Sequence, residues 1–146
     1  MADQTIVTSY AASGVQPREL CTGVLATYAV YSLSRTLSAS DKIYMCKIPD
    51  GARIVGMEFM FNNNLFYNAG VVNVGTPANA VQFITSVTPS AGLKFAINTG
   101  GGLGAVLDVS DAATNKWTYI QVSVSTAATG TATGSMSLVV LYQMDQ

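Results

Sequence analysis

The sequence predicts an all-β protein, a single-domain antiparallel β-sandwich of jelly-roll type with an extended N-terminal arm. Two observations carry this prediction. Short apolar segments alternate with polar residues at the period of a half-buried strand, and turns rich in Gly, Asn and Pro separate them about every 8–12 residues. Neither a linker nor an internal repeat divides the 146 residues, which are enough for one domain with its own core.

Residues 1–20 are expected to form the arm, and residues 21–146 the sandwich domain. The arm carries the apolar residues Ile6, Val7 and Tyr10, followed by small residues and a proline that interrupt a strand. Two interpretations remain open for it. The arm is either a partly ordered terminus or a segment that pairs with a neighbouring subunit or shell surface.

Residues 21–37 fit both a helix face and a strand alternation. We assign a strand because Tyr, Val and Thr prefer strands and no capping box precedes the segment. Ser38–Asp41 is expected to be a polar turn into the next element.

The segment Asp41–Phe61 is expected to form two paired strands joined by a tight turn. Pro49 sets φ at the first central position of that turn, and Gly51 tolerates a positive φ. The second strand places its large apolar residues on one face at a period of two, so a second sheet must cover them. These residues are Val55, Met57, Phe59 and Phe61, whereas Gly56 and Glu58 fall on the opposite face.

Further strands are expected at Val71–Val74, Leu93–Ile97 and Val106–Val109. Residues 78–87 fit a helical turn or a strand, with Val81, Phe83 and Ile84 facing inward. The last two strands alternate most regularly. Their inward residues are predicted to be Ile120, Val122 and Val124, then Met136, Leu138, Val140 and Tyr142, whereas Gln121, Ser123 and Ser125 take the polar face.

The composition indicates a protein that packs against another surface. Charged residues make up 10% of the chain, against a typical value of about 25%, so its exterior must be mostly neutral. The net charge is −1 and the seven basic residues are scattered, which argues against nucleic acid as a partner. No apolar run approaches the ~18–20 residues of a membrane span, and the N-terminus lacks a signal-peptide pattern. We therefore expect synthesis in a cytoplasm.

The sequence offers little for catalysis. It contains no histidine, which removes the usual activated nucleophiles and the commonest metal ligand. Gly100–Gly104 lacks the residues of a phosphate-binding loop and is expected to be a flexible surface loop, and Asp108–Asp111 lacks the ligand spacing of an EF-hand. We therefore expect that the protein is not an enzyme and that it binds neither a cofactor nor a metal ion. Cys21 and Cys46 are expected to be buried thiols, with a disulfide as the alternative.

Four segments together resemble small β-sandwich proteins that decorate or cement the heads of tailed bacteriophages. They are DKIYMCKIPDGARIVGMEFMF at Asp41–Phe61, VVNVGTPANAVQF at Val71–Phe83, INTGGGLGAVLDV at Ile97–Val109, and the closing pair WTYIQVSVS and GSMSLVVLYQ within Trp117–Gln143.

The resemblance implies a capsid decoration protein that binds the outer face of a phage head and stabilises it. The implied partners are the major capsid protein of the same virion and further copies of this chain, with a trimer favoured. We expect the contacts at Ile6, Val7 and Tyr10, and at Lys47 and Arg53, which flank the turn and for which the resemblance suggests an inter-subunit salt bridge. The protein would reside on the capsid surface after synthesis in the host cytoplasm.

The alternative is a glycan- or receptor-binding module of a head fibre or tail appendage. Its candidate stacking residues are Tyr44, Phe66, Tyr67, Trp117 and Tyr119. Three or more aromatic residues on one exposed face would favour a glycan, whereas a dry apolar patch would favour a protein contact.

Overall fold

The computed structural model describes residues 5–7, 18–20, 23–33, 35–62, 70–88, 94–99, 102–104, 106–107, 117–127 and 134–144. None of these residues is helical, so the predicted all-β class is confirmed. The strands are β1 (Thr5–Val7), β2 (Arg18–Leu20), β3 (Val24–Leu33), β4 (Lys42–Pro49), β5 (Ala52–Asn62), β6 (Val71–Gly75), β7 (Ile84–Val87), β8 (Lys94–Ala96), β9 (Trp117–Thr126) and β10 (Gly134–Met144).

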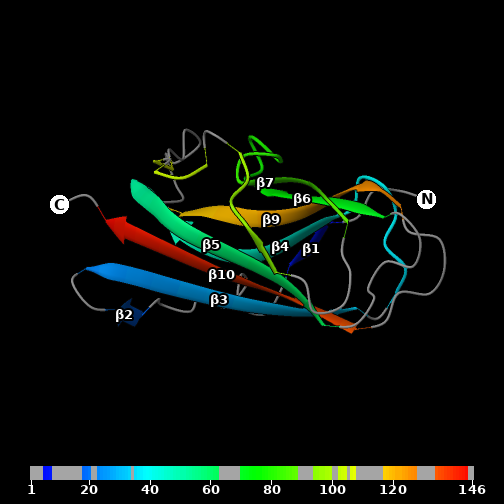
Figure 1. Cartoon of the computed structure of the whole chain (residues 1–146), viewed down its shortest axis with the longest axis horizontal. Coiled ribbons are helices and arrows are strands. Elements are labelled where there is room, and N and C mark those ends of the chain that lie inside the picture. The colour runs from blue at the N-terminus through cyan, green and yellow to red at the C-terminus, as the bar shows by residue number, and fades with distance from the viewer. Residues whose placement is uncertain are drawn as a thin grey trace.

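The strands form two sheets that pack face to face as a sandwich (Figure 1). The first sheet has the order β1-β4-β9-β6-β7, and the second has the order β2-β3-β10-β5-β8. All neighbours pair antiparallel except β1, which runs parallel to β4. The predicted β-sandwich is thus confirmed.

The expected hairpin at Asp41–Phe61 is wrong, because its two strands lie in different sheets. β4 pairs with β1 and β9, whereas β5 pairs with β10 and β8. The turn Pro49–Gly51 therefore crosses from one sheet to the other. The apolar pattern is the same for a hairpin and for a crossing of this kind, so the pattern alone did not distinguish them. The expected positive φ of Gly51 is confirmed at 75°.

The predicted inward face of β5 is wrong at Val55, because the strand contains a β-bulge there. Gly56 pairs with Leu141 and Ile54 pairs with Tyr142, so Val55 is an extra residue. An extra residue reverses the alternation. As a result Ile54 is fully buried, whereas Val55 is half-buried; Met57, Phe59 and Phe61 face the core as expected.

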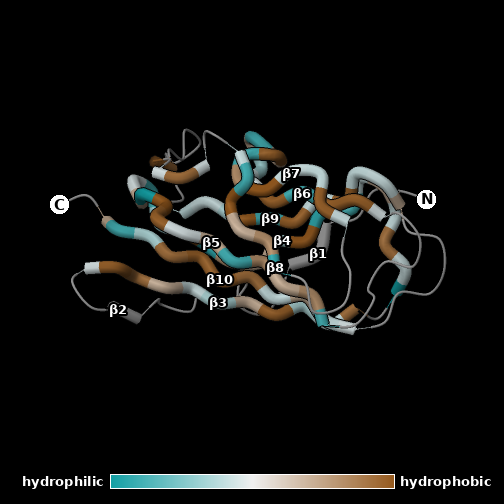
Figure 2. The backbone as a smooth tube through the Cα atoms, in the orientation of Figure 1, coloured by the Kyte–Doolittle hydropathy of each residue, from teal (hydrophilic) through white to brown (hydrophobic). Residues whose placement is uncertain are grey.

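The core lies between the sheets and draws side chains from both. Figure 2 shows hydrophobic residues on the strands of both sheets. Along β10, buried positions recur at every second residue from Met136 to Tyr142. Phe59 is fully buried, and its ring lies edge-on to Phe61, with centroids 4.4 Å apart. The buried apolar residues of β9 and β10 are those predicted: Ile120, Val122, Val124, Met136, Leu138, Val140 and Tyr142.

Other expectations have mixed outcomes. The strand assigned within 21–37 is confirmed as β3, and Phe83 and Ile84 face inward. Val81 is 45% exposed instead, because β7 begins only at Ile84 and leaves Val81 on the preceding turn. Val106 forms a single bridge with Arg53 rather than a strand. Leu93 and Val109 lie outside the described residues.

Asp41 anchors the turn that leads into β4. It is 1% exposed, accepts a hydrogen bond from the Ser38 amide at 2.9 Å and forms an ion pair with Arg35 at 3.1 Å. Its own carbonyl accepts a hydrogen bond from the Val124 amide, which fastens the turn to β9. The expected polar turn at 38–41 is therefore also a buried contact with the first sheet.

Phe59→Ala should lower the free energy of unfolding by roughly 3–5 kcal/mol, because it removes a fully buried aromatic ring and leaves a cavity. Denaturant titration measures the loss. Tyr28→Ala is the control, since Tyr28 is 48% exposed on the neighbouring part of the second sheet, and it should change stability far less. Equal losses in the two variants would contradict the assignment of Phe59 to the core.

Gly51→Val should cost about 1–3 kcal/mol because a β-branched residue is strained at a φ of 75°. No atom lies within 4 Å of a Cβ built at Gly51, so the cost would come from the backbone rather than from a clash. Gly51→Asn is the matched control, since asparagine tolerates positive φ better, and thermal unfolding should rank wild type, Asn and Val in that order. A Val variant as stable as the Asn variant would refute this explanation.

Candidate functional site

Two of the three N-terminal candidates, Ile6 and Val7, belong to β1, the strand that pairs with β4 at the edge of the first sheet. Within β1, Ile6 is opposite Ile43 and Val7 is opposite Tyr44 on β4. Tyr10 lies outside the described residues. The arm thus reaches the edge of the first sheet, which is also the edge nearest to Lys47 on β4.

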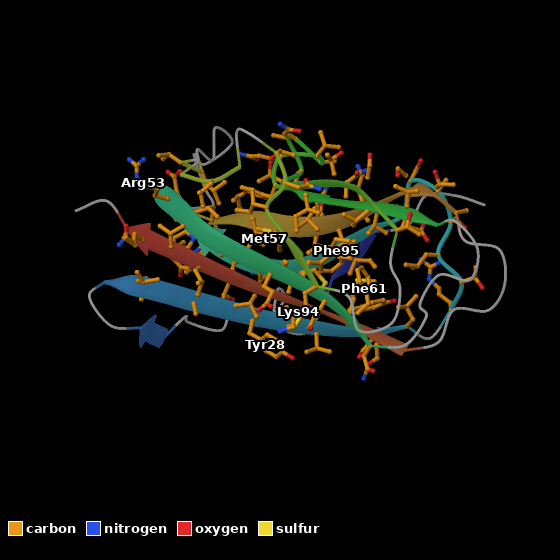
Figure 3. All side chains as sticks on the ribbon, viewed as in Figure 1. Tyr28, Arg53, Met57, Phe61, Lys94 and Phe95 are labelled. Carbon is orange, nitrogen blue, oxygen red and sulfur yellow. The ribbon has the colours of Figure 1, made fainter. Side chains whose placement is uncertain are left out.

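Lys47 and Arg53 lie on opposite outer faces of the sandwich. Lys47 is paired with Tyr119 on the first sheet, and its Nζ lies 5.6 Å from the centre of that ring. Arg53 belongs to the second sheet, near the start of β5 (Figure 3), and its Nη1 donates to the Gly104 carbonyl at 3.4 Å. The structure therefore does not bring these two residues into one site, because the turn between them changes sheet.

Two of the candidate stacking aromatics are already in contact with each other. The rings of Tyr44 and Tyr119 are stacked, with centroids 4.4 Å apart and planes 13° apart. Trp117 lies two residues before Tyr119, on the same side of β9, and all three side chains are half-buried. Each of these two rings covers one face of the other, and a sugar would need such a face for stacking. Phe66 and Tyr67 lie outside the described residues.

The outer face of the first sheet is partly covered by its own chain. A Cβ built at Gly75 would lie 2.1 Å from the Asn79 carbonyl oxygen, so only glycine lets the following turn cross this face. Gln121, which is opposite Gly75, is 1% exposed, and its side-chain amide has no hydrogen-bond partner within the described part of the chain. Its expected place on a solvent-facing polar surface is therefore wrong, because the sheet there is covered.

The outer face of the second sheet carries both apolar and charged side chains, and Arg53 lies at one end of it. Tyr28 projects from it with 48% of its surface exposed, and half-buried Val139 lies next to Tyr28 on β10. Lys94 lies on the same side of the second sheet as Tyr28 (Figure 3). Its Nζ forms an exposed ion pair with Glu58 Oε1 at 3.1 Å. The two charges of this ion pair thus offset each other.

The edge of the second sheet beside β5 contains a pocket. β8 pairs with residues 58–60 of β5. Residues 104, 106 and 107 contact residues 52–54 through the Gly104 and Leu107 amides and the Arg53–Val106 bridge. Between these two contacts lies a pocket of about 570 Å³. Its described lining residues are Gly56, Met57, Ala96, Ile97, Asn98, Thr99 and Leu103.

Exposed apolar side chains gather on the segments around this pocket. Leu103 is 66% exposed and Val106 is 46% exposed, both on the segment that forms one side of the pocket. A second, smaller pocket of about 240 Å³ lies between the turn after β6 and residues 106–107. We call residues 76–82, 96–99, 102–104 and 106–107 the loop surface. The sequence contained one signal for it, a lone leucine within the glycine run.

A buried thiol lies in the core, away from these surfaces. Cys46 is a free cysteine, fully buried, and burial raises its pKa to about 12 despite a hydrogen bond with Thr27. Burial, followed by the nearby Cys46, also raises the pKa of Tyr142 to about 12. The expectation of a buried thiol is confirmed for Cys46, whereas Cys21 lies outside the described residues.

The described part of the chain contains no cluster of three or more cysteine, aspartate or glutamate side chains that would hold a metal ion. Nor does it contain a helix long and apolar enough to cross a membrane.

The raised pKa values predict that Cys46 is unreactive in the folded protein. In a Cys21→Ser variant, iodoacetamide at pH 8 should label Cys46 in denaturant but not under native conditions, because the thiolate is the nucleophile. Mass spectrometry measures the labelling. Rapid native labelling would contradict the burial of this thiol.

The same shifts also predict the pH dependence of stability. In the folded chain both groups are held neutral, whereas in the unfolded chain they ionise at their ordinary pKa values, 9.0 for the thiol and 10.0 for the phenol. Their contribution to the free energy of unfolding is therefore complete below pH 9 and is lost as the pH rises towards about 12, which denaturant titration at increasing pH measures.

No family model and no curated protein sequence matches the chain. Two solved phage structures contain chains of similar fold. A chain of the capsid of Ralstonia phage GP4 aligns with a TM-score of 0.79 and 16% identity, covering 98% of this chain and 99% of that chain. A chain of the cyanophage Pam1 capsid asymmetric unit aligns with a TM-score of 0.68 and 21% identity, covering 90% and 93%. The resemblance to phage head β-sandwich proteins is thus confirmed at the level of the fold.

Proposed function

We propose that the protein is a structural component of a phage capsid. The observation that carries this proposal is a fold shared along 98% of the chain with a chain from the Ralstonia phage GP4 capsid. The scarcity of charge supports it, since a weakly charged exterior suits a protein that is covered by neighbours in an assembly.

Within the capsid we propose the role of a decoration or cement protein on the outer face of the head. Its partners would be the major capsid protein of the same virion and copies of itself, with a trimer favoured by the resemblance described above. The binding site for the decoration protein would be formed where capsid subunits meet, so it would exist on the assembled shell and not on free subunits. Binding there stabilises the shell by mass action, and no chemical step is required.

Shells assembled without this protein test the proposal. The purified chain should cosediment with such shells and raise the temperature at which they release their contents or dissociate. Absence of binding at saturating concentration would refute the decoration role, and binding without any gain in shell stability would refute the cementing role.

The arm provides a sharper test. Deletion of residues 2–16 should leave the domain folded, because β1 pairs through only three residues at a sheet edge. Ordering a longer arm costs about 1–2 kcal/mol per residue, so we propose that contacts with a neighbour hold it in place.

The truncated chain should therefore bind shells more weakly than the full chain, measured by cosedimentation, while circular dichroism reports an intact fold. If truncation unfolds the protein, the arm is part of the domain core. If binding keeps its full strength, the shell contact lies elsewhere.

A further inference from the structure

We propose that Asn98 seals the edge strand β7, so that another copy of this chain cannot add a strand to it. β7 is the last strand of the first sheet and β8 is the last strand of the second. Asn98 follows β8 by two residues and contacts β7, so it lies between the two edges on one side of the sandwich. The inference depends only on contacts within the chain and is independent of the capsid role.

The β7 segment has the composition of a strand that pairs with copies of itself. Residues 82–88 read QFITSVT, in which five of the seven residues are aromatic or β-branched. The segment contains no charged residue, proline or glycine. Segments of this kind stack as in-register strands where an edge is free. Many proteins guard such edges with charged side chains, which this segment lacks, so the edge needs another form of protection.

The side chain of Asn98 takes the place of a neighbouring strand at Thr85. Its Oδ1 accepts a hydrogen bond from the Thr85 amide at 2.8 Å, and its Nδ2 donates to the Thr85 carbonyl at 3.0 Å. In an antiparallel sheet, a residue at a hydrogen-bonded position makes this same pair of bonds with the residue opposite. The carboxamide therefore occupies both main-chain groups that an added strand would use at this position.

The main-chain groups on either side of Thr85 are also engaged. The Phe83 carbonyl accepts a hydrogen bond from the Asn98 amide at 3.0 Å, and the Ser86 amide donates to Asn73 Oδ1 at 2.7 Å. The pairing of β6 with β7 is irregular here, and Ser86 has a φ of 55°. Irregularities of this kind turn an edge away from regular pairing. An arriving strand would have to break these bonds before it could pair with β7.

The exposure of Asn98 favours a protective role over a stabilising one. Asn98 is exposed, so water would satisfy the Thr85 amide and carbonyl if the side chain were removed, and the fold would lose little. The same removal would leave both groups free for a strand of another copy. We therefore expect the side chain to matter more for solubility than for folding.

Asn98→Ala tests the inference in the full chain, because it removes both side-chain bonds. In amide hydrogen exchange followed by NMR, the Thr85 amide should exchange about tenfold faster than in the wild type, as expected from the loss of one hydrogen bond. The Phe83 amide donates to the Val74 carbonyl and should keep its rate. At high protein concentration the variant should form aggregates that bind thioflavin T, whereas the wild type should stay soluble.

Two further variants distinguish an open edge from a general loss of stability. Asn98→Ala combined with Thr88→Lys places a positive charge on an exposed residue next to the open edge, and should restore solubility without restoring protection of the Thr85 amide. Gly51→Val is the control, since it strains the backbone at the turn Pro49–Gly51 and leaves β7 untouched. It should stay soluble when all variants are compared well below their unfolding temperatures.

Circular dichroism reports whether each variant is folded. Rapid exchange of the Thr85 amide in the wild type overturns the inference, as does an Asn98→Ala variant as soluble as the wild type. Equal aggregation of Gly51→Val also overturns it. Failure of both Asn98→Ala and Asn98→Ser to fold would do the same, because the inference requires a side chain that the fold can lose.

Discussion

The turn Pro49–Gly51 is the constraint on which the rest of the structure depends. It moves the chain from the first sheet to the second within three residues, and the positive φ of Gly51 makes this change of direction possible. The Gly51 amide also donates to the Leu107 carbonyl at 2.8 Å, which ties a distant segment to the crossing. Because β4 and β5 separate here, their apolar faces meet across the core instead of lying side by side.

The same crossing shapes the exterior. It places Lys47 and Arg53 on opposite outer faces, so two residues that are close in sequence serve different surfaces. It also brings residues 104–107 alongside the start of β5, where they share a sheet edge with β8. The pocket and the exposed Leu103 result from that shared edge.

The interior is specified by packing more than by polar contacts. Cys46 and Tyr142 approach each other from opposite sheets, and burial keeps both neutral over the ordinary pH range. Among the described residues, the phenol of Tyr142 and the side-chain amide of Gln121 find no hydrogen-bond partner, and a buried polar group without a partner costs stability.

The sequence by itself determined the class of fold, most of the longer strands and most of the core. Alternation at a period of two depends on local geometry, so it correctly placed Phe59 and the inward faces of β9 and β10. The tertiary structure alone decided which strands share a sheet, because a hairpin and a sheet crossing require the same turn residues and the same apolar pattern. It also decided the bulge at Val55, the burial of Gln121 and the gathering of the loop surface, since each depends on contacts between residues far apart in the chain.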